Sequence, residues 1–452
     1  MRNRLSLRRI VIWYIYIMFF YITFETIILN ALNVIAPGFM AVVRYGIEGI
    51  GYVLLFMVFV IRIHDVKKII FFDYLIIATI FISIATSIVN TDSIQIFVIG
   101  FRYLLRYLYI YLLIRYINFA DYEIIKIFRM IRIVMIIEII LVIWQIIDPN
   151  SSYIVLFPHY RNIIEGFNSA LNTVISKLAV FGSLGRYNLF GYFITLAIWY
   201  WIAEQNEKKT KKNLLMIIVW ILLLVISFSR QTIIGIIGAY ILYVFSKKKI
   251  TLKHLLFIIG IFSVLIILFI KAFSFTIPDN YTNVGIGTVN SSIYDRYISM
   301  FSLQFLQIDY EGYGRTWFLS EGILRLIKEK PLFGFGIGMY GCPDTLKSTT
   351  YLYNKLGIPT TYYMDVYLGC LIGQIGIIGT AIYLSLYINI AAKAKAVFTK
   401  KKNDVLYRKL SIITFGIVVS ALIMIFFSSS LCNRVMAYYL WLFIGLFVSR
   451  QR

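Results

Sequence analysis

The stretch Leu222–Tyr240, LLLVISFSRQTIIGIIGAY, sets one arginine, Arg230, between two apolar runs. Three roles fit such a residue: an anchor on the cytoplasmic side of a membrane, a structural cap, or a binding group. The role depends on the compartment that the arginine faces, because Lys and Arg at the ends of membrane spans gather on the cytoplasmic side.

The whole chain has the composition of an integral membrane protein. Of its 452 residues, 60% are apolar and 14% are charged, and its mean hydropathy is +0.83. An ordinary soluble protein carries about 25% charged residues. Apolar runs of roughly 20 residues recur along the chain, each long enough to cross a ~30 Å hydrocarbon core as a helix. The sequence therefore predicts an all-α, polytopic membrane protein.

The apolar runs predict about twelve transmembrane helices. They lie at 10–30, 39–61, 69–89, 94–114, 128–147, 187–203, 213–228, 231–246, 254–273, 363–390, 409–428 and 433–449. The first run follows a basic N-terminus without a small-residue cleavage site, which predicts a retained span rather than a signal peptide. Helices 1–9 thus fall within 1–273, and helices 10–12 within 363–452.

The net charge of +23 predicts the orientation of these spans. Lys and Arg gather in alternate segments, at 2–9, 62–68, 115–126, 208–212, 247–249, 393–409 and 450–452. Loops that are rich in Lys and Arg stay in the cytoplasm, so the N- and C-termini are predicted to be cytoplasmic. The same pattern explains the basic charge without a nucleic-acid partner.

Two long segments are predicted to lie outside. Segment 148–186 has an apolar spacing that suggests a piece on the membrane surface. Segment 274–362 is long enough, and apolar enough, to fold as a helical cap. The three cysteines have no CxxC spacing and the three histidines are scattered, so neither a disulfide framework nor a zinc site is indicated.

With this topology, Arg230 lies at the outer end of a hairpin between two spans. A headgroup anchor fits this position, and so does a fixed cation at the mouth of a cavity, since a guanidinium group offers a rigid fork of donors to a phosphate. Asp365 lies at the outer entrance of the tenth span, in TTYYMDVYLGCLIGQIGIIG. It fits either a counter-ion of the arginines or a general base.

A second charged motif covers Tyr313–Gly341, YGRTWFLSEGILRLIKEKPLFGFGIGMYG. Arg315, Trp317 and Arg325 are predicted to share a helix that ends at Pro331. The glycines that follow predict a turn with close backbone packing, because neither a strand nor Gly-Lys-Ser/Thr accompanies them. Aromatic residues of the outer loops offer rings for stacking on sugars, namely Tyr313, Trp317, Tyr340, Tyr362 and Tyr363.

Charged residues also lie within the spans. Arg102 and Arg106 are near the middle of the fourth span, and Glu138 is midway along the fifth. A charge at that depth is costly unless it is paired, which predicts a buried Arg–Glu pair. A polar lining for a lipid phosphate is the alternative.

In this order, the motifs resemble the bacterial O-antigen polymerase and ligase superfamily of integral membrane glycosyltransferases. The resemblance covers roughly 180–385. It rests on GRYNLFGYFI at Gly185–Ile194, on Ser229-Arg230, on the arginine-led motif from Gly314, and on the span entry at Asp365. It implies a GT-C-like helical bundle with a large extracytoplasmic loop.

The resemblance also implies an activity. It implies transfer of a glycan from an undecaprenyl-diphosphate carrier to an acceptor hydroxyl at the outer face of the bacterial cytoplasmic membrane, without a metal or other cofactor. Expected partners are the lipid-linked donor and acceptor, membrane lipid, a chain-length regulator and a flippase. Catalytic roles fall on Arg230, Arg315 and Asp365, and substrate contacts on Arg186, Arg325, Trp317 and Tyr363.

Three functions follow from these residues. A polymerase of lipid-linked repeat units, making O-antigen or capsule, is favoured because the ligase branch has His-Asn or His-Asp where this chain has Met364-Asp365. The alternatives are a ligase that moves glycan to lipid A or a surface acceptor, and a flippase or exporter of lipid-linked oligosaccharide. Transporters commonly show repeated halves, and this sequence shows no repeat.

Overall fold

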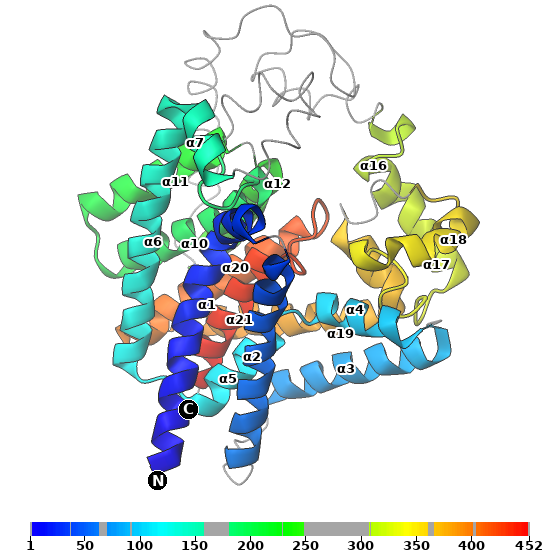
Figure 1. The fold of residues 1–452 in the computed structure, drawn as a ribbon, viewed down its shortest axis with the longest axis horizontal. Coiled ribbons are helices and arrows are strands. Elements are labelled where there is room, and N and C mark those ends of the chain that lie inside the picture. The colour runs from blue at the N-terminus through cyan, green and yellow to red at the C-terminus, as the bar shows by residue number, and fades with distance from the viewer. Residues whose placement is uncertain are drawn as a thin grey trace, which may run out of the picture.

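The computed structural model describes residues 2–36, 38–62, 70–90, 93–157, 180–227, 229–247, 307, 309–359, 366–400 and 404–450. Every regular element in these ranges is a helix, as predicted (Figure 1). The predicted span at 254–273 and the whole of segment 274–306 lie outside the described residues.

The bundle consists of thirteen described helices. They are α1 (Arg2–Ile35), α2 (Phe39–Arg62), α3 (Phe71–Asn90), α4 (Ile94–Leu104), α5 (Leu108–Ile117), α6 (Asp121–Ile147), α7 (Pro149–Leu156), α10 (Tyr187–Glu207), α11 (Lys211–Ile226), α12 (Arg230–Ser246), α19 (Tyr367–Thr399), α20 (Val405–Met424) and α21 (Arg434–Ser449). A helix therefore lies at eleven of the twelve predicted spans.

Six of the described helices are long and apolar enough to cross a membrane, and the bent pair α4 and α5 makes a seventh if it is one span. The six are α1, α2, α3, α6, α19 and α20. Two of the others, α12 and α21, are apolar but have only 17 and 16 residues. The structure therefore supports a membrane-embedded helical protein, while the count of twelve spans stays a prediction.

The fourth predicted span is not one straight helix. It breaks between Leu104 and Leu108, and α4 and α5 meet at 59°. Tyr107 at the break has φ 65, a left-handed conformation that is unusual for a bulky residue. Backbone strain of this kind depends on tertiary contacts, so the apolar run alone could not predict it.

The centre of the bundle is α10, which has 13 of its 21 residues buried and packs against α11, α12, α20 and α21. Its contact with α20 depends on Gly416, because a Cβ atom there would lie 1.8 Å from the Trp199 ring. The Trp199 indole in turn donates a hydrogen bond to Ser420 Oγ at 3.1 Å. A small residue facing a large one thus lets two helices approach closely.

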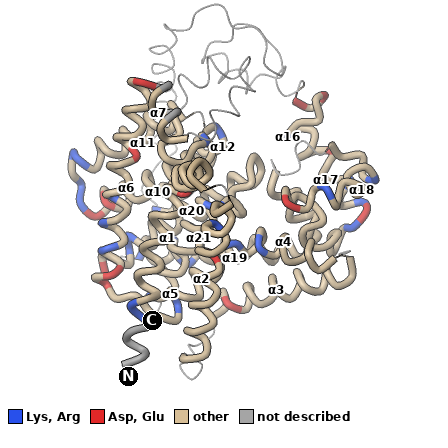
Figure 2. The backbone as a smooth tube through the Cα atoms, in the orientation of Figure 1, with Lys and Arg blue, Asp and Glu red and all other residues tan. Residues whose placement is uncertain are grey.

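Ion pairs gather the charged segments at one end of the bundle, which we call the basal end. The Arg8 guanidinium lies 2.6 Å from Glu123, and Lys409 lies 2.8 Å from Glu204. Further pairs join Arg408 with Glu207, and Arg450 with Asp121 and Asp404. Both termini lie at this end (Figure 1), and basic and acidic segments lie near each other around it (Figure 2). Five of the segments predicted to be inside therefore lie together.

The segment 309–359 forms a compact helical cap beside α4 and α19 (Figure 1). Its elements are α16 (Arg315–Trp317), a π-helical turn (Phe318–Gly322), α17 (Ile323–Glu329), a 3₁₀ turn (Pro343–Thr345) and α18 (Leu346–Leu356). The first three run on without interruption, as the predicted helix before Pro331 requires. Tyr340 is fully buried in the core of the cap, with its ring stacked on Tyr353 at 4.8 Å.

The glycine-rich turn after α17 packs backbone against backbone, as predicted. Gly334, Gly336, Gly338 and Gly341 all have positive φ. A Cβ atom on Gly338 would lie 2.3 Å from the carbonyl oxygen of Ile96 in α4. The turn therefore ties the cap to the bundle, and no phosphate needs to be invoked to explain its glycines.

Candidate functional site

Three helices begin with an arginine at the end opposite the basal end, which we call the apical end. Arg186 caps α10, Arg230 opens α12 and Arg434 opens α21. These helices finish at the basal end, where Lys247 after α12 contacts Asn206 of α10 and Arg450 follows α21. A positive charge at a helix N-terminus opposes the helix dipole, so these arginines weaken their own helices and favour an anion at this end.

The two motifs that carry Arg186 and Arg230 lie side by side. A Cβ atom on Gly191 would lie 2.3 Å from Ser229 Oγ and 2.4 Å from Thr232 Oγ1, so only glycine fits there. These two hydroxyl groups are hydrogen-bonded to each other at 2.7 Å. The close contact explains why the sequence combines GRYNLFGYFI with Ser-Arg, and it brings the N-termini of α10 and α12 together.

Arg434 belongs to the same region through Glu25 of α1. It forms an ion pair with Glu25, whose Oε1 also lies 3.9 Å from Arg44 Nε. The next residue, Thr26, donates a hydrogen bond to the carbonyl of Leu184 at 2.9 Å, two residues before Arg186. Sequence reasoning missed Arg434, although an arginine at the outer start of a span was the same signal that identified Arg230.

The buried Arg–Glu pair has a different partner from the predicted one. Arg102 and Arg106 pair with Glu48 of α2, at 2.8 Å and 3.5 Å, rather than with Glu138. The break between α4 and α5 accounts for the error, since a straight fourth span gives no indication of which neighbour its arginines face. We call Glu25, Arg44, Glu48, Arg102, Arg106 and Arg434 the apical arginine cluster.

Glu138 instead holds the turn that precedes Arg186. It is fully buried, accepts a hydrogen bond from the Ser183 amide at 2.9 Å, and forms a second one with the Ser183 hydroxyl. Gln145, two turns further along α6, binds the backbone of Phe181 and Gly182. These contacts fix the path of the chain into α10 and thereby the position of Arg186.

Three residues predicted for the site lie in the cap. Arg325 donates hydrogen bonds to the carbonyl groups of Leu356 and Gly357 at 3.2 and 2.9 Å, and it lies 5.1 Å from the centroid of the Trp317 ring. Trp317 is 4% exposed. Both residues therefore hold the cap together, and their contacts with substrate stay predictions. Arg315 opens α16 and is half-buried.

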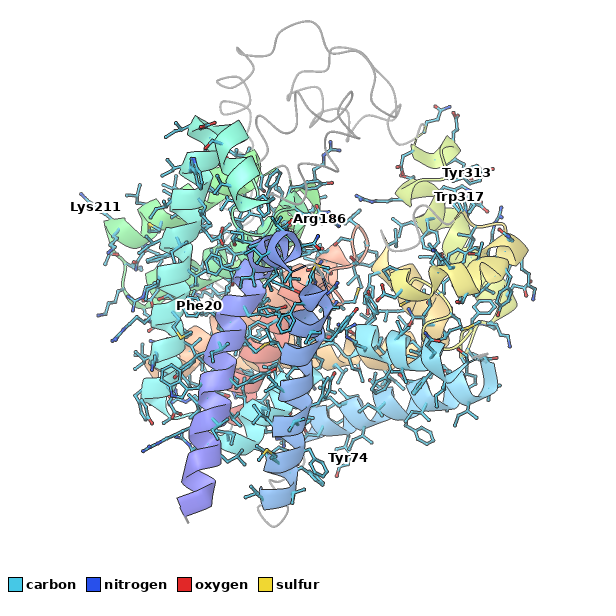
Figure 3. All side chains as sticks on the ribbon, viewed as in Figure 1. Phe20, Tyr74, Arg186, Lys211, Tyr313 and Trp317 are labelled. Carbon is cyan, nitrogen blue, oxygen red and sulfur yellow. The ribbon has the colours of Figure 1, made fainter. Side chains whose placement is uncertain are left out.

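Figure 3 shows Arg186 on the bundle and Trp317 on the cap, both above Tyr74 in this view. Arg186 is exposed, whereas Arg230 is half-buried. Asp365 and Tyr363 lie outside the described residues, so their roles stay predictions. Among the described residues, no three His, Cys, Asp or Glu side chains are grouped as a metal site would require.

Comparisons with known proteins assign no family to the chain. No family model matches it, and no curated protein matches it either. The apical arginine cluster therefore carries the functional argument by its own geometry.

Proposed function

We propose that the protein is a membrane glycosyltransferase that polymerises undecaprenyl-diphosphate-linked repeat units into a surface polysaccharide. The observation that carries this proposal is the group of ion pairs in the apical cluster, where, among the described residues, Arg44, Arg102, Arg106 and Arg434 pair with only two glutamates, Glu25 and Glu48. An excess of guanidinium groups in a partly dry site suits a ligand with two or more negative charges, such as a diphosphate.

The orientation of the bundle supports the same activity. If the basal end lies in the cytoplasm, as its lysine-rich segments favour, the apical cluster faces the outer side of the cytoplasmic membrane. A polymerase that uses glycans already translocated on a lipid carrier needs its cationic site on that side.

The chemistry follows from the charges. The acceptor hydroxyl attacks the anomeric carbon of the donor glycan, the bond from that carbon to the diphosphate oxygen breaks, and the diphosphate lipid leaves with the electron pair. Arg230 and Arg315 stabilise the negative charge that grows on the leaving oxygen. Asp365 either accepts the proton of the acceptor hydroxyl or orients an arginine.

The test uses purified protein in lipid with lipid-linked repeat units as the sole substrate. A polymerase lengthens the chains without a second kind of acceptor, and Arg230→Ala and Arg315→Ala abolish lengthening while the protein still inserts. Near-normal chain lengths in both variants refute the assignment. Product that forms only after lipid A is added indicates a ligase, and movement of labelled lipid without a new glycosidic bond indicates a flippase.

A further inference from the structure

The break between α4 and α5 is a strained point inside the bundle. Tyr107 is 2% exposed and has φ 65. A buried non-glycine residue in this conformation costs roughly 1–3 kcal/mol and persists only where the surroundings enforce it. Broken helices at membrane depth occur where they are buried in protein or line a cavity, because the freed backbone groups need partners there. At this break the Tyr383 hydroxyl donates a hydrogen bond to the carbonyl of Leu104 at 3.1 Å.

The two arginines at the break share one carboxylate unequally. Arg102 donates a hydrogen bond from Nε to Oε2 of Glu48 at 2.9 Å, and its Nη2 lies 2.8 Å from the same oxygen without making a hydrogen bond. Arg106 reaches Oε1 only at 3.5 Å, and its buried Nε has no hydrogen-bond partner. Arg106 is 7% exposed. A buried guanidinium with an unused donor is costly, since desolvation is not repaid by pairing.

Positive charge remains in excess when the neighbouring groups are included. Arg434, Glu25, Glu48 and Arg106 all lie near enough to Tyr107 to act electrostatically on its hydroxyl group, which also donates a hydrogen bond to Glu48 at 3.4 Å. Arg44 adds a second cation to Glu25, and Arg102 a second cation to Glu48. Among the described residues, these four arginines and two glutamates carry a net charge of +2. Folding alone does not explain this excess, because each unpaired charge at membrane depth opposes insertion.

Exposed apolar side chains lie on α2 and α4 beside the break. Tyr45 on α2 and Val98 on α4 are 50% and 58% exposed, and the Arg102 guanidinium lies over the Tyr45 ring at 4.9 Å. A ligand that enters between α2 and α4 would therefore place an apolar chain against exposed apolar side chains and its headgroup against the arginines.

We propose that the α4–α5 break is a binding site for a dianionic diphosphate group, with Arg106 as the principal donor and Arg102 and Arg434 beside it. The charge of +2 matches a diphosphate that is esterified at both ends, and the dipole of α5, which begins at the break, adds to the attraction. The proposal rests on the proposed function for the identity of the lipid, whereas the binding of a diphosphate follows from the cluster itself.

The test measures binding of farnesyl diphosphate to the purified full-length protein in detergent, with Arg106→Gln as the main variant. Removing one charged donor to a phosphate is expected to weaken binding about 10- to 100-fold. Glu48→Gln leaves four arginines against one glutamate, so it is expected to bind the probe at least as tightly as the unmodified protein. Unchanged binding in Arg106→Gln overturns the proposal. Equal loss in both variants also overturns it, because the cluster would then serve only the fold.

A matched control removes another buried ion pair from the same helix. Arg115 on α5 pairs with Asp73 on α3, so the double variant D73N/R115Q is neutral and should bind farnesyl diphosphate normally. Gel filtration shows whether each variant is folded, and Arg106→Lys, which keeps one charge, replaces Arg106→Gln if that variant aggregates. Weakened binding in Arg106→Lys relative to the unmodified protein supports the site, and unchanged binding overturns it.

Two further measurements show which part of the ligand is recognised and distinguish failure of the site from failure of the proposed function. Competition by inorganic pyrophosphate supports a diphosphate site, whereas its failure to compete, together with competition by farnesol, overturns the proposal because the lipid chain alone then carries binding. Chain extension is measured in parallel. If the unmodified protein binds farnesyl diphosphate but does not lengthen chains, only the proposed function is wrong. If it lengthens chains and Arg106→Gln binds farnesyl diphosphate as tightly as the unmodified protein, only the proposed site is wrong.

Discussion

The carbonyl oxygen of Pro331 accepts a hydrogen bond from the amide of Ile377 at 2.9 Å, inside a break in α19. The break lies at Gly376, whose φ of 66 and ψ of −173 are not helical. Amides of Phe335 and Gly336 bind the carbonyl groups of Gly373 and Gln374, which the break leaves free. A loop of the cap thus completes the hydrogen bonding of a broken membrane helix.

Gly376→Ala is predicted to destabilise the protein strongly. A Cβ atom there would lie 2.2 Å from the carbonyl oxygen of Leu332, and the backbone conformation of φ 66 and ψ −173 is essentially restricted to glycine, so alanine costs about 1–3 kcal/mol before any clash. Thermal unfolding of the purified protein in detergent measures the effect. The control is Gly46→Ala in α2, where a Cβ atom meets nothing within 4 Å and alanine favours the helix. Equal unfolding midpoints for Gly376→Ala and Gly46→Ala would contradict a stabilising role for the hydrogen bonds between the cap and the break in α19.

Glu138→Ala is predicted to loosen the turn before α10. The change leaves the buried Ser183 amide without its acceptor, which costs about 1–3 kcal/mol, while the Ser183 hydroxyl can still donate to the carbonyl of Thr23 at 2.9 Å. We expect a lower unfolding midpoint and faster proteolysis within 180–186 than in the unmodified protein. Glu329→Ala is the control, because its ion pair with Lys355 is exposed and contributes at most ~1 kcal/mol. If Glu138→Ala is as stable as Glu329→Ala, Glu138 does not position Arg186.

The apolar runs of the sequence predict where helices form, because any segment in lipid must satisfy its backbone hydrogen bonds internally. Thus α2 and α10 begin at the residues where the predicted spans 39–61 and 187–203 begin. The breaks at Tyr107 and Gly376 were not predictable, since each is fixed by contacts with another helix or with the cap.

The same distinction applies to the candidate site. The position of Arg230 between two apolar runs already marked it as a residue at a helix end, which the structure confirms. The partner of Arg102 and Arg106 could not be read from the sequence, because Glu25, Glu48 and Glu138 all lie in apolar runs and only packing selects Glu48. Arg325 illustrates the opposite case, a conspicuous charge that packs within the cap.

Cysteine labelling tests which end faces outward. Cys342, Cys370 and Cys432 are all buried, and burial also raises the pKa of the Cys342 thiol, so little thiolate is present at neutral pH. Background labelling should therefore be low. Arg186→Cys is predicted to react with a membrane-impermeant maleimide in intact cells, and Lys208→Cys, which is also exposed, only after permeabilisation. The reverse pattern would place the apical cluster in the cytoplasm and leave the proposed mechanism without a site.

Arg186→Ala and Arg325→Ala are predicted to separate function from stability. Arg186 is exposed at the N-terminus of α10, where a positive charge is unfavourable by about 0.3–1 kcal/mol, so its removal should keep or slightly raise the unfolding midpoint while chain extension falls. Arg325→Ala removes two hydrogen bonds and a contact with the Trp317 ring, which should destabilise the protein by about 1–4 kcal/mol. Extension assays and unfolding curves on the same preparations check both expectations. If Arg186→Ala loses as much stability as Arg325→Ala, Arg186 stabilises the fold. An arginine that serves only substrate binding would instead destabilise α10, because its charge opposes the helix dipole.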